Sequence, residues 1–414
     1  DEVGFPSLVI LLNRFFCIIN IILKFILLIS NCVTDNLGAI VAMVKKHIQD
    51  QKETSQICFS SEYYQGNASF SEGSFDWDEK IQGHILGSFF YGYAITNAIG
   101  GPASHYFGAR LVAGFGIGLS YPAINDLIAK WYPIQERSKY ASIIFAGLSF
   151  GTVITMAVTG WLCSTDFLGG WPSAFYITGL VGIVWTVFWL LLIRNDPAKH
   201  PFISFEELQY IQEGCPDRKE RLPVPWGSIF QSKYFWVLVI THVGYNWGFY
   251  IMLTELPTYL DKILHVPLRS NGLLSSMPYL FSWIFNMLYG FIIGKVTSKG
   301  YLSILSVRRL SMAIAGYGPM ICLLVMCFVN CEANLAVFVF VLSGALSGAM
   351  FCGLLSSHAD IAPRYAGTLT GLTNAFATIP GFAGPALTGH LTEGNQTIWA
   401  WRIVFLICVF HIRH

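Results

Sequence analysis

The sequence is poor in charge. Only 12% of its 414 residues are Asp, Glu, Lys or Arg, and the formal net charge is +1. Average soluble domains carry about twice this share of charged residues. A net charge so close to zero gives no polybasic surface, so the electrostatic footprint of a nucleic-acid-binding protein is excluded. The chain is therefore not expected to be soluble or to have a nucleic-acid partner.

Motifs of catalysis and metal binding are also missing. The ten cysteines are scattered, with no C-x-x-C pair and no Cys/His cluster at zinc spacing. There is no H-E-x-x-H, no G-x-S-x-G and no His/Asp cluster within an apolar segment. We therefore expect no enzyme, no metal and no organic cofactor. Most cysteines are expected to serve packing, and only Cys58 and Cys331 are candidates to face an oxidising compartment, with no basis for pairing them.

Long apolar runs are what the sequence has in abundance. Apolar residues make up 54% of the chain, and runs of about 18 or more recur along it, the length that crosses a bilayer as a helix. The first of these apolar runs is interrupted by Lys24, and we interpret it as one kinked or tilted helix. This pattern predicts an all-α polytopic membrane protein with about 11 spans: Phe15–Val44, Ile81–Gly101, Leu111–Ala129, Tyr140–Leu162, Ala174–Ile193, Tyr234–Leu256, Gly272–Ile293, Leu310–Val329, Leu335–Leu355, Ala366–Gly389 and Ala400–Phe410.

A long polar connector divides these spans into two groups. It covers residues 194–233, and Ser204 followed by Glu207 three residues later is typical of the start of a capped surface helix. The sequence therefore predicts an N-terminal helical bundle over residues 1–193, a cytoplasmic connector, and a C-terminal helical bundle over residues 234–414.

Basic residues and glycosylation sequons predict the orientation. Lys and Arg gather in four loops, at 130–139, within the connector, at 295–309 and at Arg364, and the positive-inside rule assigns such loops to the cytoplasm. The sequons Asn67-Ala68-Ser69 and Asn395-Gln396-Thr397 should face the opposite side. We therefore expect glycosylation at Asn67 and Asn395.

The predicted spans give one membrane crossing fewer than the predicted orientation of the loops requires. The span that begins at Ile81 must end on the cytoplasmic side, and so must the span that follows Arg110. Only the eight residues 102–109 lie between these two spans. A crossing is therefore expected to be missing between Gly101 and Arg110.

Several motifs carry a resemblance to a known family. They are FDWDEKIQGHILGSFFYGYAITNAIGG from Phe75, GFGIGLSYPA with WYPIQERSK, NWGFYIMLTELPTYL from Asn246, and HADIAPRYAGTLTGLTNAFATIPG from His358. In these motifs, which cover both halves in family order, the chain resembles the anion:cation symporter branch of the major facilitator superfamily, the group of sialin, the vesicular glutamate transporters and the sodium/phosphate cotransporters. Within this group, the chain most resembles the insect inorganic phosphate cotransporters.

The resemblance implies a fold and a mechanism. The fold is the major facilitator fold of two helical bundles, and the mechanism is alternating access of a central site to the two sides of the membrane. In the family a third helix precedes the arginine that opens the next helix, and here that helix is absent. The last helix also ends early, so a partial or alternatively spliced gene product is expected.

The expected function is secondary active transport of a small organic or inorganic anion, phosphate favoured, by cation-coupled symport. The coupling ion is sodium or a proton. Proton-coupled relatives carry acidic residues on the fourth helix, where Ala113 and Ile117 stand here, so sodium is favoured by elimination. We expect a monomeric, multi-pass protein of the plasma membrane or of a lysosomal or vesicular membrane. The alternative is a transport-inactive or regulatory relative that keeps the scaffold.

Candidate substrate-binding residues follow from chemistry and from the family motifs. An anion in a low-dielectric cavity needs a cation or several donors. Arg110 is the candidate cation, with a snorkelling role at the helix end as the alternative. Asn374 is either a ligand or the donor of a bond between helices. The motifs add aromatic walls and hydrogen-bond donors: Tyr91, Tyr93, Asn246, Trp247 and Tyr250.

Other polar residues are assigned to coupling and gating. Asp126 and His84 are the candidates for coupling. Asp360 and Arg364 flank Pro363 and are expected to lock the inward-facing gate. Two further predictions concern the helix that begins near Tyr234. Its Glu255 is expected at the outer end, within reach of water. Its Tyr245 stands where vesicular glutamate transporters hold an arginine, which argues against glutamate.

Overall fold

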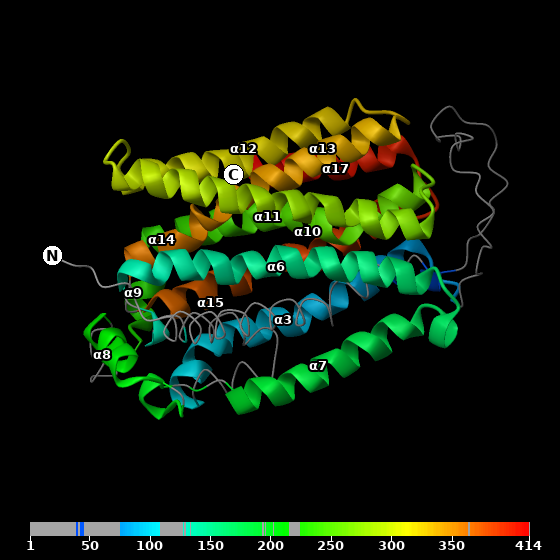
Figure 1. Cartoon of the computed structure of the whole chain (residues 1–414). Helices are drawn as coiled ribbons and strands as arrows, with labels where there is room; N and C mark the ends of the chain where they lie inside the picture. The colour runs from blue at the N-terminus through cyan, green and yellow to red at the C-terminus, as the bar shows by residue number, and fades with distance from the viewer. Residues whose placement is uncertain are drawn as a thin grey trace.

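The computed structural model describes residues 39, 42–44, 75–107, 127, 130–132, 134–192, 194, 196–201, 203–214, 224–362 and 365–413. Within these ranges the chain forms helices and a single isolated bridge, Val44 to Phe75, and no strand (Figure 1). The all-α expectation is confirmed for this part of the chain. The predicted spans Phe15–Val44 and Leu111–Ala129 lie almost wholly outside the described residues.

The first half contributes three long helices and the connector two short ones. They are α3 (Glu79–Phe107), α6 (Ile134–Cys163), α7 (Pro172–Leu192), α8 (Phe205–Gly214) and α9 (Trp226–Gln231), with 3-10 turns η3 (Phe167–Gly169) and η4 (Pro197–Lys199). Helix α8 begins as its capping motif predicts, because the Ser204 hydroxyl accepts a hydrogen bond from the Glu207 N–H at 3.2 Å. The division of the chain at residues 194–233 stays a prediction.

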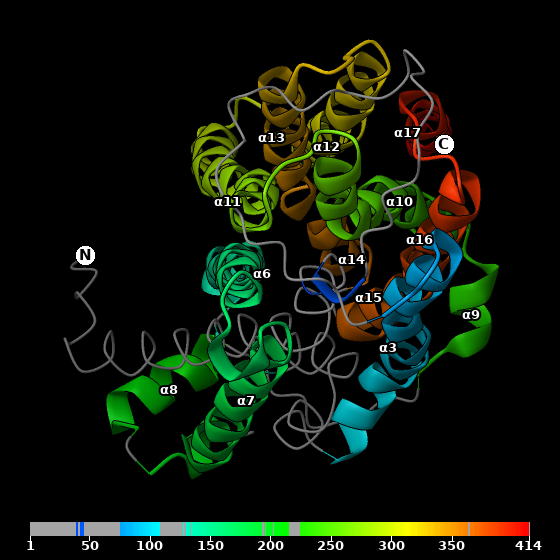
Figure 2. The ribbon, with the colours of Figure 1, turned by 90° about the vertical axis from the view of Figure 1, so that its right-hand side faces the viewer.

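The second half contributes the remaining helices. They are α10 (Lys233–Lys262), α11 (Leu268–Ser298), α12 (Ile304–Met326), α13 (Ala333–Ser347), η5 (Gly348–Phe351), α14 (Leu354–Ile361), α15 (Ala366–Ala377), α16 (Ile379–Thr392) and α17 (Ile398–Arg413). Viewed along the bundle axis, α6 lies between α7 and α11, and α3 lies beside α15 and α16 (Figure 2).

Apolar side chains cover the outside of these helices. On α7, Leu180, Ile183 and Leu191 are each more than 60% exposed, an arrangement that water would penalise and lipid favours. By length and composition, four helices of the described part of the chain can cross a membrane: Pro172–Leu191, Ser270–Thr297, Ile304–Met326 and Ala333–His358. The structure therefore supports a multi-pass membrane protein.

Two of the predicted spans are broken rather than continuous. Leu335–Leu355 is divided among α13, η5 and α14, and Ala366–Gly389 is divided into α15 and α16 at Thr378. The second break has a clear cause, because Pro380 has no N–H to donate and Gly381 bonds instead to the Thr378 carbonyl at 2.8 Å. Broken helices leave backbone carbonyls that need new donors.

The helices share two ends that differ in charge. The basic end carries Lys233, Lys295, Lys299 and Arg308, and we refer to the other as the sequon end, because it carries Asn395. Asn395 is exposed, as expected for a glycosylation site, whereas Asn67 lies outside the described residues. Cys331, between α12 and α13 at the sequon end, is disulfide-bonded.

The directions of α3 and α6 bear on the missing crossing. Helix α3 starts at the sequon end, where Lys80 pairs with Glu393 at 3.3 Å. Helix α6 ends there, because its Met156 and Gly160 backbone touches Gly272 at the start of α11. Phe107 and Ile134 therefore both lie at the basic end (Figure 1). An even number of crossings is needed between them, and residues 108–133 are too few for two crossings of about 20 residues each.

Candidate functional site

The two halves meet along two seams. In the first, α3 packs against α15 and α16, and in the second α6 packs lengthwise against α11 (Figure 2). Phe90 of α3 also meets Tyr250 of α10, with ring centroids 4.7 Å apart. A solute that passes between the halves must pass between these seams, so they frame the candidate path.

Backbones approach closely at the sequon end of both seams. A side chain at Gly83 of α3 would collide with the Pro385 carbonyl of α16. In the second seam, a Cβ atom at Gly272 would lie 2.7 Å from the Met156 carbonyl and 2.9 Å from the Gly160 Cα atom. Contacts this close exclude any solute between the backbones. The two halves are therefore in direct backbone contact along both seams at the sequon end.

Four of the predicted ligands converge beside the first seam. Asn374 of α15 is buried and donates a hydrogen bond to the Tyr93 hydroxyl of α3 at 3.3 Å. Asn246 of α10 is 5% exposed and donates to the Ala377 carbonyl at 2.9 Å. That carbonyl lies at the α15–α16 break, so Asn246 supplies the donor that the break requires. Tyr250, one turn further along α10, packs against Phe90.

Two other predicted ligands lie elsewhere. Trp247 stacks on His411 of α17, with ring centroids 3.8 Å apart and planes 5° apart, so it packs within the second half. Tyr91 is 49% exposed and lies against Phe382 of α16. His84, the coupling candidate on α3, is exposed. Arg110, Asp126 and Arg364 lie outside the described residues.

The middle parts of the helices that the structure describes carry no lysine or arginine that could bind an anion. Lysine and arginine side chains that the structure describes lie in connectors or within about two turns of a helix end. The buried donors between the halves are neutral amides and hydroxyls. The role of Arg110 as the anion-binding cation therefore stays a prediction.

The position of Glu255 differs from the one that the sequence predicted. The sequence placed it at the outer end of its span within reach of water, but it is 5% exposed. It faces the interior of the second half, where Phe340, Trp401 and Phe405 border the same narrow cavity. The aromatic residues of α17 pack over this face of α10 and exclude the solvent.

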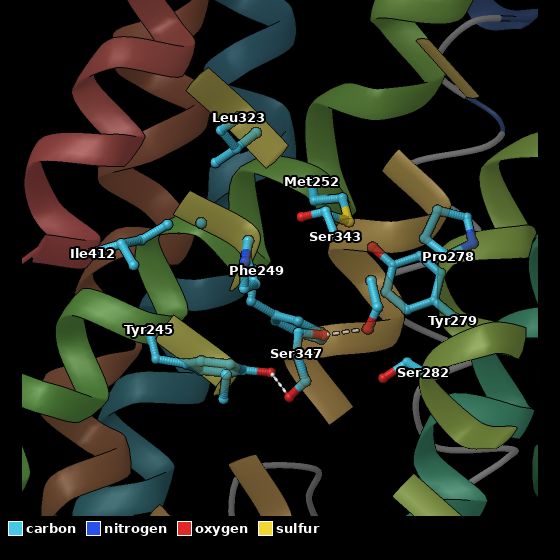
Figure 3. Close-up of a pocket in the computed structure, with 14 residues that line it drawn as sticks. Tyr245, Phe249, Met252, Pro278, Tyr279, Ser282, Leu323, Ser343, Ser347 and Ile412 are labelled. Carbon is cyan, nitrogen blue, oxygen red and sulfur yellow. Dashed lines mark hydrogen bonds between the residues drawn. The ribbon is translucent and has the colours of Figure 1, made fainter. Parts of the chain in front are cut away.

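A separate cavity lies within the second half (Figure 3). It is bordered by α10, α11, α12 and α13, and the Tyr245 hydroxyl donates to the Ser347 carbonyl at 3.3 Å on its wall. The Tyr279 and Ser343 hydroxyls are buried there without a hydrogen-bond partner in the described part of the chain, a place suited to bound water. None of the predicted ligands lines this cavity.

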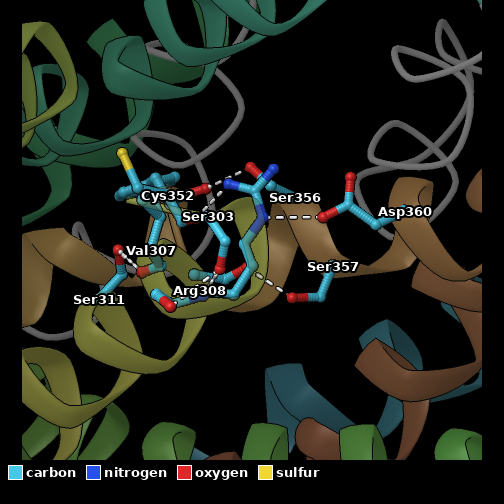
Figure 4. A network of polar contacts seen from close by, with 11 residues as sticks. Ser303, Val307, Arg308, Ser311, Cys352, Ser356, Ser357 and Asp360 are labelled. Atoms are coloured by element: carbon cyan, nitrogen blue, oxygen red, sulfur yellow. Dashed lines mark hydrogen bonds and ion pairs between the residues drawn. The ribbon is translucent and has the colours of Figure 1, made fainter. Parts of the chain in front are cut away.

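Asp360, predicted to act in gating, has a partner that the sequence did not indicate. Its carboxylate accepts a hydrogen bond from Arg308 Nε at 2.8 Å, and Arg308 Nη1 donates to the Cys352 carbonyl at 2.6 Å (Figure 4). Arg308 thereby ties α12 to Asp360 near the end of α14 and to Cys352, which precedes this helix. The predicted gating role of Asp360 stays a prediction, and the observed pair lies within the second half.

Replacing Arg308 by alanine is expected to lower the thermal unfolding midpoint of the purified protein. The change leaves the Cys352 carbonyl without this charged donor and Asp360 without its cation, a loss of about 1–2 kcal/mol for a pair that is partly exposed. Arg309→Ala, one position along α12, is the matched control and should change the midpoint little. Equal midpoints for Arg308→Ala and the wild type would refute a stabilising role for the pair.

The contact between the halves can be tested at Tyr93. Tyr93→Phe removes the acceptor of the Asn374 amide and should reduce transport efficiency about threefold to tenfold, the effect of one net hydrogen bond. Tyr91→Phe is the control, because Tyr91 lies on the surface of the same helix. The measurement is initial-rate uptake into proteoliposomes, and identical rates for the two variants would show that the Asn374–Tyr93 bond contributes nothing.

Comparisons with known proteins agree with this architecture. Residues 106–385 match the model of the Major Facilitator Superfamily. Human sialin is 38% identical over 366 residues, covering 80% of this chain and 73% of sialin. A Drosophila melanogaster protein named "putative inorganic phosphate cotransporter" is 34% identical over 376 residues, covering 82% of this chain and 71% of that protein.

One solved structure shows the fold at low sequence identity. The inward open xylose transporter XylE from E. coli superposes with a TM-score of 0.65, at 11% identity, over 96% of this chain and 94% of XylE. Such a likeness concerns the helical arrangement alone.

Proposed function

Because this chain belongs to the Major Facilitator Superfamily, and within it to the anion:cation symporter group, we propose that it moves a small anion across a membrane by cation-coupled symport, with inorganic phosphate as the first candidate. Sialin and the Drosophila phosphate cotransporter support this group of solutes. The observation that carries the proposal is the polar contact between the halves, Asn374 to Tyr93, beside the buried Asn246.

The arrangement suits alternating access. The halves touch closely at the sequon end, through glycine-mediated backbone contacts and the exposed Lys80–Glu393 pair, which contributes about 1 kcal/mol or less. Such contacts separate and reform without breaking a covalent or strongly buried link. The Asn374–Tyr93 bond lies where a solute between the halves would replace it. Arg110 would then supply the positive charge for the anion.

A monomer embedded in the bilayer is sufficient for this mechanism, because both seams lie within one chain. The plasma membrane and a lysosomal or vesicular membrane are both compatible with the proposal. Sodium was favoured from the sequence because Ala113 and Ile117 replace acidic residues. That elimination concerned one helix alone, so sodium and the proton are compared directly in the experiment below.

The test is uptake of labelled phosphate by the purified chain in sealed proteoliposomes. An inward sodium gradient, an inward proton gradient and no gradient are compared, and unlabelled phosphate and glutamate are added as competitors. Saturable uptake that phosphate inhibits more strongly than glutamate is the expected result. Uptake equal to that of empty liposomes under every gradient would contradict the proposal.

That negative outcome would favour the second candidate, a transport-inactive or regulatory relative. The observation behind it is the position of Phe107 and Ile134 at the same end of the bundle, with too few residues between them for two crossings. Inserting a helix of about 20 residues after Phe107 would restore the number of crossings. Recovery of uptake on insertion would assign the inactivity to that missing helix.

A further inference from the structure

Two histidines are buried together at the junction of α10, α14 and α15. His242 of α10 is 2% exposed and His358 of α14 is 0% exposed. Both imidazoles reach the same hydroxyl, that of Thr373 on α15: His242 Nδ1 at 3.3 Å and His358 Nε2 at 2.8 Å. The two ring centroids are 6.2 Å apart. A single hydroxyl therefore bridges two titratable rings from separate helices.

The hydroxyl of Thr373 allows the bridge to take up a proton without losing a hydrogen bond. Its own proton can point to the Thr370 carbonyl at 3.2 Å, while its lone pairs accept N–H bonds from both rings. Rotation of the hydroxyl lets it donate to either ring instead. Nδ1 of His358 is buried and makes no hydrogen bond of normal geometry to a described residue. An added proton can thus form an N–H bond on either ring.

No carboxylate among the described residues neutralises that proton. Helix α14 carries Asp360, which is bound to Arg308 of α12, and α15 brings no charged side chain. The structure describes other charged or titratable side chains on α10, on the helices packed against it and on α3. They are Lys233, Tyr234, Tyr245, Tyr250, Glu255, Tyr259, Asp261 and Lys262 on α10, Tyr279, Tyr289 and Lys295 on α11, Arg309, Tyr317 and Cys322 on α12, Tyr365 before α15, His390 on α16, Arg402, Cys408 and His411 on α17, and Glu79, Lys80, His84, Tyr91 and Tyr93 on α3. None of them pairs with either ring.

An isolated positive charge is strongly disfavoured in such a buried place. A proton on the histidine pair is therefore stabilised when an anion is bound nearby, and the anion is stabilised by the proton. By thermodynamic linkage, each would raise the affinity of the other by the same factor. This mutual stabilisation is what symport of an anion with a cation requires.

The bridge also adjoins the contact between the halves. Thr373 is followed directly by Asn374, whose amide donates to Tyr93 of α3. His242 precedes Asn246 by one turn on α10, and Asn246 holds the α15–α16 break. A change in the hydrogen bonds of Thr373 thus reaches the residues that lie between the halves.

We propose that His242, Thr373 and His358 form the proton-binding site of this transporter, and that the coupling ion is a proton carried there together with the anion. The inference rests on the proposed function. A proton enters from water, forms an N–H bond on one imidazole, and leaves that nitrogen to water on the other side of the membrane after the anion. No electron transfer or covalent intermediate is involved. A proton at this site replaces the sodium ion that the sequence favoured.

The experiment compares labelled phosphate uptake with and without an inward proton gradient, in proteoliposomes that hold the full chain. We expect the gradient to raise wild-type accumulation about tenfold, a coupling of typical size. His242→Gln, His358→Gln and Thr373→Val should lower this ratio to about one, and Thr373→Ser, which keeps the hydroxyl, should restore it. His390→Gln, at an exposed position, should keep the wild-type ratio.

The ratio of uptake with the gradient to uptake without it distinguishes a loss of coupling from a loss of folded protein. A protein that is merely damaged loses uptake under both conditions alike. Wild-type ratios in the three variants, or a wild-type ratio of one, overturn the proposal. If the wild type moves no phosphate at all, the proposed function fails, and the site is judged by imidazole nitrogen NMR of the purified protein. Titration of the two rings between about pH 5 and about pH 8, altered for both by Thr373→Val, supports the site; two rings that stay neutral throughout overturn it.

Discussion

Replacing Gly272 by valine is expected to reduce transport by more than about tenfold. The added atoms meet the Met156 carbonyl at 2.7 Å and the Gly160 Cα atom at 2.9 Å from the Cβ position, and backbone atoms cannot move aside as a flexible side chain would. Overpacking of this kind costs about 1–3 kcal/mol, which corresponds to roughly fivefold to 150-fold in an equilibrium between two states. The state closed at the sequon end is the one that bears this cost.

Helix α11 offers a matched control for this change. Gly294 lies on the same helix, and a Cβ atom there has no neighbour within 4 Å. Gly294→Val should therefore keep nearly wild-type uptake, although it carries the same loss of helix propensity. If both valine variants transport at the wild-type rate, the close approach of α6 and α11 is not required for the transport cycle.

Replacing Asn246 by leucine is expected to have the second large effect. The buried amide is the donor to the Ala377 carbonyl at 2.9 Å, and no N–H of α16 replaces it, because Gly381 bonds to Thr378. A buried carbonyl left without a donor costs about 1–3 kcal/mol. We expect uptake to fall about tenfold or more, since the break then shifts together with the neighbouring Asn374.

The control for Asn246→Leu is its neighbour. Trp247 turns away from the break and stacks on His411 of α17, so Trp247→Phe keeps an aromatic ring and should change the uptake rate less than twofold. Both variants are compared at equal amounts of folded protein, checked by gel filtration. Similar losses in the two variants would show that Asn246 acts only through general packing of α10.

The spans of the described part were predictable from the sequence, and the breaks were not. Helices α3, α7 and α17 agree with the predicted spans to within a few residues, with α3 extending six residues past Gly101, because each is one apolar run bounded by polar residues. The 3-10 turn within the run from Leu335 to Leu355 could not be predicted, because the apolar pattern continues through Gly348. Pro380 marked the α15–α16 break, but a proline alone does not say whether a helix bends or ends.

The candidate site was predictable in part. Asn374 was expected either to bind substrate or to bond between helices, and the structure places its amide on Tyr93. Asp360 was expected, together with Arg364, to lock the inward-facing gate, and its contact with Arg308, 52 residues away, was not predicted. Local sequence does not reveal partners that only the tertiary fold brings together.

The histidine bridge was missed for the same reason. His242 lies 131 residues from Thr373, and the two meet only when α10 packs against α15. One signal was available, because a histidine within an apolar span is costly and calls for a partner. Glu255, in the same span, carried the same signal and was instead assigned to water.

The most direct measurement of the central account, in which an anion passes between two halves that separate at the sequon end, is transport by a cross-linked chain. Cysteines at Lys80 and Glu393, whose side chains lie 3.3 Å apart across the first seam, are joined by a short, reducible bifunctional thiol reagent in proteoliposomes. The account predicts that phosphate uptake falls to the level of empty liposomes and returns on reduction, while each single-cysteine variant is unaffected by the reagent. Undiminished uptake by the cross-linked protein would contradict it.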